Sequence, residues 1–143
     1  RQQWKPEDWH LVLGVWAGEQ PIGTQAVSAK AFAANRAVTS GSWLGQAFQG
    51  KGYGTEMRAA VLELAFHGLG AERAESAWLD GSHASRRVSE KLGYRVVGRG
   101  TVSPRGRPTG ETKVEIRRED WLSPFDVVIA NLEPALPLFG IDA

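Results

Sequence analysis

The stretch Gln49-Gly50-Lys51-Gly52-Tyr53-Gly54 lies between an apolar run that ends at Trp43-Leu44 and an amphipathic run that begins near Thr55. Three glycines in five positions leave out the Cβ atoms that would keep a ligand away from the backbone. The helix predicted after them points its unpaired N–H groups and the positive end of its dipole toward the same place. A strand, a glycine turn and a helix N-terminus in this order predict a binding site for a phosphate or pyrophosphate.

Spacing separates three nucleotide-type motifs at this stretch. A dinucleotide fingerprint has G-x-G-x-x-G, whereas the glycines here alternate as G-x-G-x-G. The phosphate-binding loop of NTPases has G-x-x-x-x-G-K, which Gly45 and Gly50-Lys51 fit, but Gly52 stands where a Ser or Thr must hold magnesium. The third motif, Q-x-x-G-x-G, is matched by Gln49, Gly52 and Gly54 and resembles the acetyl-coenzyme A loop of the GNAT N-acetyltransferase superfamily. The alternative to all three is an ordinary tight turn between a strand and a helix.

The composition is that of one soluble globular domain: 143 residues, 42% of them hydrophobic and 23% charged. The net charge is +1, far below the concentrated basic field typical of proteins that bind nucleic acid or an anionic membrane surface, so neither partner is expected. Without cysteine, signal-peptide pattern or long apolar run, the chain is predicted to be cytoplasmic. His10, His67 and His83 stand in separate segments without metal-ligand spacing, so no metal site is predicted.

Apolar periodicity predicts a sheet organised around one β-α-β unit. In chain order we expect strands at 10–17, 22–31 and 37–44, a helix at 55–67, a strand at 73–79 parallel to the third, a second helix from the N-cap Ser82 to Gly93, and strands at 94–98 and 112–117 that flank a loop at 102–110. Turns are expected at 18–21 and 34–36.

Three details of these elements bear on the site. Gly41, inside the third strand, predicts a bulge or a close backbone approach. On the first long helix, the core-facing side is expected to hold Met57, Val61, Leu64 and Ala65, and the solvent-facing side Glu56, Arg58 and Glu63. On the second helix, the buried side is expected to hold Ala84, Val88 and Leu92.

A second motif makes the resemblance specific. The segment Ser82–Tyr94, SHASRRVSEKLGY, resembles the GNAT segment N-x-A-S-x-R-V-x-E-K-L-G-F/Y and follows the glycine loop by about thirty residues. Together with Ser42-Trp43-Leu44-Gly45, the similarity covers roughly residues 9–121 and is closest to the branch with ribosomal-protein N-terminal alanine and serine acetyltransferases. It implies an α+β fold: a mixed, mostly antiparallel central sheet with a β-α-β acetyl-coenzyme A core and flanking helices.

The resemblance also implies a reaction and its binding residues. In this family an acetyl group moves from acetyl-coenzyme A to a primary amine, on a protein N-terminus or a small molecule, by direct attack. Amides of the glycine loop hold the coenzyme pyrophosphate, and the third strand pairs with the pantetheine arm. The implied cofactor-binding residues are Trp43, Leu44, Gln49, Gly50, Lys51, Gly52, Tyr53, Gly54, Thr55 and Ser82. Ser85 matches a serine that protonates the departing thiolate in related enzymes; helix capping is its alternative role, as a solvated side chain is for Lys51.

Two departures from the family pattern leave the general base open. Thr39 stands where a glutamate of the base path is often found, and Ser82 replaces an asparagine. Asp80, His83 and Glu56 are substitute bases by proximity in sequence, beside water or a base from the acceptor. A non-catalytic acyl-coenzyme A binding or sensor module is therefore the alternative function.

The expected domain organisation has two parts. Residues 1–122 form the acetyltransferase domain, but nothing before His10 resembles the strand and two helices with which the family normally begins. We therefore expect either a fragment or an acceptor wall supplied from elsewhere. Residues 123–143 form an apolar, Pro-spaced tail, which is expected to pack on the domain or on the second subunit of a homodimer.

Overall fold

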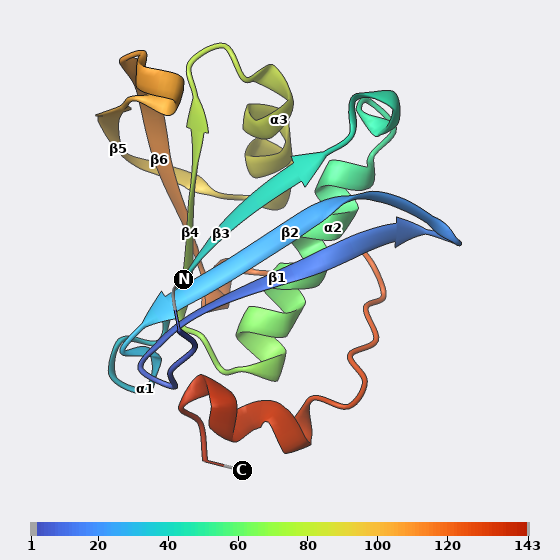
Figure 1. Cartoon of the computed structure of the whole chain (residues 1–143), viewed down its shortest axis with the longest axis vertical. Helices are drawn as coiled ribbons and strands as arrows, with labels where there is room; N and C mark the ends of the chain where they lie inside the picture. Colours follow the sequence, from blue (N-terminus) through green and yellow to red (C-terminus); the bar gives the residue numbers. More distant parts are fainter. Residues whose placement is uncertain (1–2, 143) are drawn as a thin grey trace.

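A computed structural model of the chain describes residues 3–142. Six strands form one sheet in the order β1-β2-β3-β4-β6-β5, in which β3 and β4 are parallel and the other neighbours antiparallel (Figure 1). The strands are β1 (Asp8–Ala17), β2 (Gln20–Lys30), β3 (Ala37–Leu44), β4 (Arg73–Leu79), β5 (Arg95–Val102) and β6 (Thr109–Arg117). This arrangement confirms the predicted α+β fold with a mostly antiparallel sheet.

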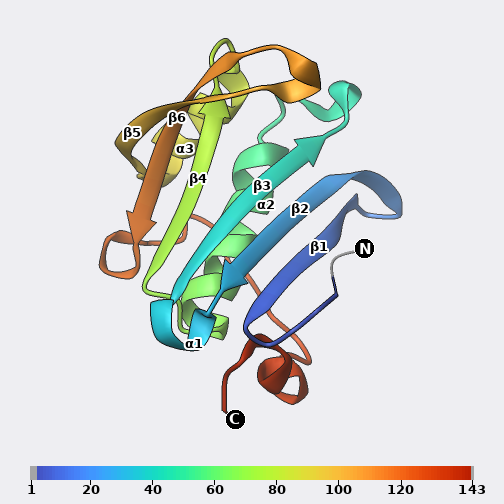
Figure 2. The same cartoon turned by 60° about the vertical axis from the view of Figure 1, so that its left-hand side comes forward.

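Two helices lie side by side on one face of the sheet, behind it in Figure 2. These two helices are α2 (Tyr53–Glu63), with its π-helical continuation η2 (Leu64–Gly68), and α3 (His83–Leu92). A one-turn helix, α1 (Phe32–Asn35), lies between β2 and β3. The short 3-10 turns are η1 (Gln46–Phe48), η3 (Pro104–Gly106), η4 (Arg118–Asp120) and η5 (Glu133–Phe139). α2 and α3 pack so closely that a Cβ on Gly54 would lie 3.3 Å from Val88 Cγ2. The core fills the space between helices and sheet with Trp9, Phe32, Leu62, Phe66 and Ile116, among others. No helix within residues 3–142 is long and apolar enough to cross a membrane.

The structure corrects the expected boundaries at two places. The turn expected at 34–36 is the end of α1, a single helical turn that buries Phe32 and is flanked by left-handed residues, Ala31 and Arg36. Strand β5 continues to Val102, into the expected loop, because Thr101 and Val102 pair with the start of β6. Both residues are β-branched, which favours extended backbone.

Three expectations about faces and bulges were wrong. β3 has no bulge at Gly41, because its register with β2 is continuous, and no other part of the described chain comes within 4 Å of a Cβ placed there. The close approach of a ligand to Gly41 stays a prediction. Ala84 is exposed because it lies in the first turn of α3, beyond the part of the helix that packs on the core, whereas Leu92 is buried as expected. Arg58 is buried, only 6% exposed, instead of facing the solvent. Its guanidinium finds hydrogen-bond partners inside the fold, as described below.

The end of the chain returns to the first strand. In η5, Phe139 packs edge-on against Trp9 and Trp4, with ring centroids 4.9 and 5.5 Å apart. The indole N–H of Trp4 donates to the carbonyl of Leu138 (2.8 Å), and that of Trp9 to the carbonyl of Phe139 (3.3 Å). The segment therefore lies against its own domain (Figure 1). The domain boundary at residue 122 and the homodimer remain predictions.

Candidate functional site

β3 and β4 form a fork. They pair only at Ala37↔Arg73, Val38↔Ala74 and Thr39↔Glu75. Beyond that point β3 stays with β2 and β4 stays with β6, so the two central strands diverge (Figure 2). The fork has its closed end at Thr39 and Glu75. Beyond it, the facing edges of β3 and β4 have no strand partner among residues 3–142. An unpaired strand edge presents backbone N–H and C=O groups to a ligand.

The glycine loop follows the open end of β3. Gly50 and Gly52 have φ of 74° and 87°, a backbone conformation that favours glycine, and a Cβ on either would meet nothing within 4 Å. Gly52 is the N-cap of α2, no side chain caps this helix, and the first helical hydrogen bond runs from Glu56 N to Gly52 O (3.1 Å). The first turn of α2 thus offers backbone N–H groups and the positive end of the helix dipole to an anion.

The Gln49 side chain anchors the start of the loop. Gln49 Nε2 donates to the carbonyl of Leu44 (3.0 Å), which ties the loop to the last residue of β3. Lys51 is exposed, Trp43 is 64% exposed, and Tyr53 and Thr55 are half-buried in the first turn of α2. The predicted cofactor residues of β3 and of the loop are therefore neighbours around one open surface, while their contacts with a coenzyme remain a prediction.

The helix α3 follows β4, the second strand of the fork. Its N-cap residue is Ser82, as expected, but the Ser82 side chain makes no capping hydrogen bond. Ser85 lies in the first turn of α3 and is exposed. A Cβ on Gly54, in the first turn of α2, would lie 3.3 Å from Val88 Cγ2, so the start of α2 lies against the second turn of α3. Ser85 is free to meet a ligand between them, and its role as an acid remains a prediction.

A polar network around the buried Arg58 spans the fork on the side of the helices, from the buried Ser76 to the exposed Ser42. Arg58 of α2 donates from Nη1 to Ser76 Oγ on β4 and from Nη2 to Ser42 Oγ on β3, each over 3.1 Å. Ser76 Oγ donates onward to the carbonyl of Ser40 (3.3 Å), and Ser42 Oγ donates to Gln25 Oε1 (2.7 Å). Arg58 therefore bridges the two diverging strands.

Sequence reasoning missed Arg58, although a signal was present. Gly54, Arg58 and Leu62 are spaced by four residues, so they share one face of α2. Gly54 contacts α3 and Leu62 is fully buried, which places Arg58 on the inner side of the helix.

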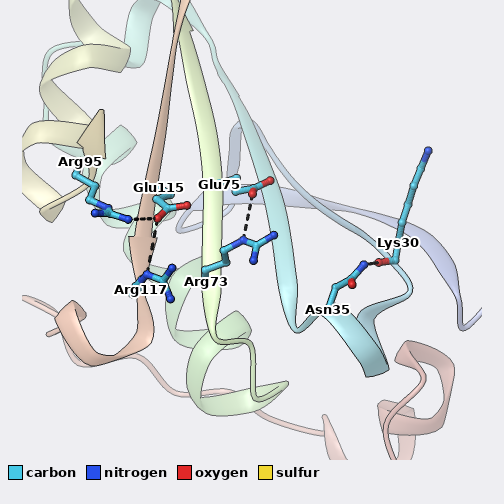
Figure 3. Close-up of polar contacts among 7 residues, drawn as sticks. All are labelled: Lys30, Asn35, Arg73, Glu75, Arg95, Glu115 and Arg117. Carbon is cyan, nitrogen blue, oxygen red and sulfur yellow. Dashed lines mark hydrogen bonds and ion pairs between the residues drawn. The ribbon is translucent and has the colours of Figure 1, made fainter. Parts of the chain in front are cut away.

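A cavity of about 500 Å³ lies at the closed end of the fork, on the face of the sheet opposite to Arg58. Its lining includes Thr39, Glu75, Arg73, His10 and Lys30. Glu75 Oε1 accepts a hydrogen bond from Arg73 Nε (3.2 Å), and both side chains remain more than two-fifths exposed (Figure 3). Glu75 was not among the expected residues, yet the parallel pairing of β3 and β4 puts it directly beside Thr39.

The substitute bases expected from sequence are placed less favourably. Asp80 is held by Arg99, whose Nη1 and Nη2 lie 3.0 and 3.1 Å from its two carboxylate oxygens. Glu56 and His83 are exposed on the first turns of α2 and α3. None of the three lines the cavity that contains Thr39.

Charges alternate along β4 and along β6, so that Glu75 lies opposite Glu115 and Arg73 opposite Arg117 (Figure 3). Glu115 of β6 accepts a hydrogen bond from Arg95 (2.6 Å) and lies 3.8 Å from Arg117 Nε. The hydrogen bond from Arg95, with the charges of Arg95, Arg117 and Arg73, holds the pKa of Glu115 below its usual range despite the opposing effect of burial. Within residues 3–142, no group of three or more His, Asp and Glu side chains is placed to hold a metal ion.

A forked sheet with a glycine turn and a helix N-terminus at its open end defines an α+β domain of the acetyltransferase type. The family model described as acetyltransferase (GNAT) domain matches residues 1–95, more than half of the chain. The chain belongs to the GNAT acetyltransferase family.

Several solved acetyltransferase structures have a similar fold. A ribosomal-protein-S5-alanine acetyltransferase from Vibrio fischeri has a TM-score of 0.70 at 19% identity, covering 81% of this chain and 64% of its own. RimJ from Mycobacterium smegmatis in complex with CoA-disulfide has a TM-score of 0.73 at 21% identity, covering 78% and 54%. A variant of spermidine N-acetyltransferase SpeG from Vibrio cholerae has a TM-score of 0.69 at 16% identity, covering 81% and 69%. The chain thus spans less than two thirds of the length of the first two.

Proposed function

We propose that this chain binds acetyl-coenzyme A in the fork between β3 and β4 and transfers its acetyl group to a primary amine. One observation carries the proposal: the two central strands separate after Thr39 and Glu75, and the glycine loop with the uncapped start of α2 lies at the open end of the same fork. A long ligand with an anionic middle and an amide-bearing arm suits this combination. The pyrophosphate would meet the loop amides, and the arm would pair with the free edge of β3.

The reaction needs a proton acceptor, because an amine is protonated at neutral pH and must lose a proton before it attacks. The amine nitrogen then forms a C–N bond with the thioester carbonyl carbon, the C–S bond breaks, and sulfur leaves with its electron pair as a thiolate. The nitrogen gives up its second proton to water as the amide forms. We assign the proton acceptor to Glu75, which replaces the carboxylate missing at Thr39 and faces the cavity. Ser85 is the proposed donor of the proton that neutralises the thiolate.

The acceptor class rests on the cavity at the closed end of the fork. This cavity of about 500 Å³ is large enough for a chain terminus or a small polyamine and has carboxylate and cationic side chains in its lining. The similar proteins include a ribosomal-protein alanine acetyltransferase and a spermidine acetyltransferase. A protein N-terminus and a small-molecule amine are therefore both proposed acceptors, and both belong in the assay.

Two measurements test the proposal. Thermal unfolding with acetyl-coenzyme A, coenzyme A and Mg-ATP in parallel measures binding, because a ligand at 100 times its dissociation constant adds about 2.7 kcal/mol of stability. Stabilisation by the two coenzymes is expected, and none by any ligand would overturn the proposal. Thiol release with an alanine-terminated peptide or spermidine then measures transfer. Binding without release would favour the non-catalytic acyl-coenzyme A module.

A further inference from the structure

Arg58 carries a buried charge that this chain does not neutralise. Its side chain is 6% exposed, and among residues 3–142 no carboxylate forms an ion pair with it. Its partners are two neutral hydroxyls, Ser42 and Ser76, and the ring of Tyr94, whose centroid lies 5.8 Å from Cζ. An arginine keeps its charge in proteins, and taking an unpaired charge out of water costs free energy.

The guanidinium is fixed at the closed end of the fork. Ser76 is the first residue of β4 after the last strand pair, and Ser42 is three residues beyond that pair on β3. Because Arg58 bonds to both, it cannot move away from the fork without breaking two hydrogen bonds. Its charge therefore lies on the helix side of the fork, across the sheet from Glu75.

Arg58 and two residues of its surroundings, Tyr94 and Ser40, carry unused hydrogen-bonding atoms. Arg58 Nε and the Tyr94 hydroxyl are buried and have no hydrogen-bond partner among the described residues, and neither has Ser40 Oγ. Each buried unsatisfied group costs free energy that a ligand or ordered water would recover. Holding the two strands apart would need only hydrogen bonds, which a neutral side chain supplies without the cost of burying a charge. A buried cation beside unused donors is suited to an anion that enters the fork.

We propose that Arg58 stabilises the negative charge that forms on the coenzyme sulfur when the thioester breaks. This inference rests on the proposed function, in which the thioester lies at the closed end of the fork. When the C–N bond forms and the C–S bond breaks, sulfur takes the bonding electron pair, and a positive charge fixed nearby lowers the energy of this thiolate. The amine's proton leaves on the opposite side, toward Glu75. The two charges on either side of the sheet thus serve the two ends of one reaction.

Within residues 3–142, the protein side chains around Arg58 are hydroxyls and one phenol, and none is a carboxylate or an imidazole. Ser40 and Ser42 of β3, Ser76 of β4 and Tyr94 face it, and Glu75 belongs to the lining of the cavity on the other side. The proposal therefore predicts that bound coenzyme A loses its thiol proton at lower pH than free coenzyme A.

The test is an ultraviolet titration of the thiolate in the complex with coenzyme A, with calorimetric affinities for coenzyme A and its S-methyl thioether between pH 6 and 10. In the natural sequence, we expect the bound thiol pKa to fall by at least about one unit, which equals a tenfold gain in relative affinity for the ionised form. The thioether cannot ionise, so its affinity should not follow this change. A bound thiol that titrates like the free coenzyme would overturn the proposal without any variant.

Variants assign the effect to Arg58. Arg58→Met should abolish the shift in the thiol pKa while the affinity for the thioether changes little, and Arg58→Lys should retain part of it. Arg87→Met removes a cation from the exposed side of α3 and should leave the shift intact. A full shift in Arg58→Met would contradict the inference while the proposed function stands. If neither coenzyme A nor the thioether binds, both the inference and the proposed function fail.

Discussion

Glu75 of β4 is the register partner of Thr39 of β3, and this pair is the last before the two strands separate. Threonine has no basic group, but the adjacent strand places a carboxylate beside it at the edge of the same cavity. The carboxylate expected on one strand is thus present on its neighbour. The ion pair with Arg73 keeps Glu75 oriented without burying it.

Glu75→Gln tests this assignment. Glutamine has the same shape but cannot take up a proton, so we expect kcat/KM for thiol release to fall by about 100-fold or more, within the range typical of general bases. The dissociation constant of acetyl-coenzyme A should not change. Glu119→Gln alters a carboxylate outside the cavity and serves as the control. An unchanged kcat/KM in Glu75→Gln would mean that water or a group of the acceptor substrate takes up the proton instead of Glu75.

Gly52→Ala tests the anion site at the start of α2. Gly52 has φ of 87° and open space where a Cβ would be, so an alanine would project into the volume proposed for the pyrophosphate. We expect acetyl-coenzyme A to bind about tenfold more weakly, a loss of about 1.4 kcal/mol, as measured by calorimetry. Gly18→Ala is the matched control, because Gly18 also has a positive φ and open space but lies in the β1–β2 turn. Equal losses in both variants would point to backbone strain instead of the site.

Local patterns in the sequence were sufficient to predict the six strands, the two long helices and the parallel β3–β4 pair. Alternation in the strands, the glycine loop and the N-cap Ser82 are short-range signals, and each involves only a few consecutive residues. The fork was not predictable in this way, because it depends on where two strands stop pairing. The four-residue spacing on α2 indicates an inward-facing Arg58, but its hydroxyl partners come from both diverging strands, and Glu75 lies beside Thr39 only through the strand register.

Glu115→Gln tests the electrostatics of the strand pair β5–β6. The pKa of Glu115 is lowered in the folded chain, so its stabilising contribution is present above the pKa of the unfolded chain and disappears as pH falls through the folded value. At pH 7 the variant should lose about 0.5 to 1 kcal/mol of unfolding free energy, measured by urea denaturation. The natural chain and the variant should converge when the pH falls below both pKa values. A difference that persists in acid would mean a packing effect.

Phe139→Ala tests how strongly the tail is attached. Phe139 is 5% exposed and packs against Trp4 and Trp9, whose indoles also hold the backbone of the same segment. Removing the ring should cost about 3 kcal/mol of unfolding free energy, because a large buried side chain is lost and a cavity remains. Leu138→Ala is the control, since Leu138 is 55% exposed, and it should change stability by less than about 0.5 kcal/mol. Phe139 lies in η5 and does not line the cavity at the closed end of the fork, so the dissociation constant of acetyl-coenzyme A should stay the same in the folded variant. If Phe139→Ala leaves the urea midpoint unchanged, the tail contributes nothing to the isolated domain, and its apolar residues would instead be available to a second subunit.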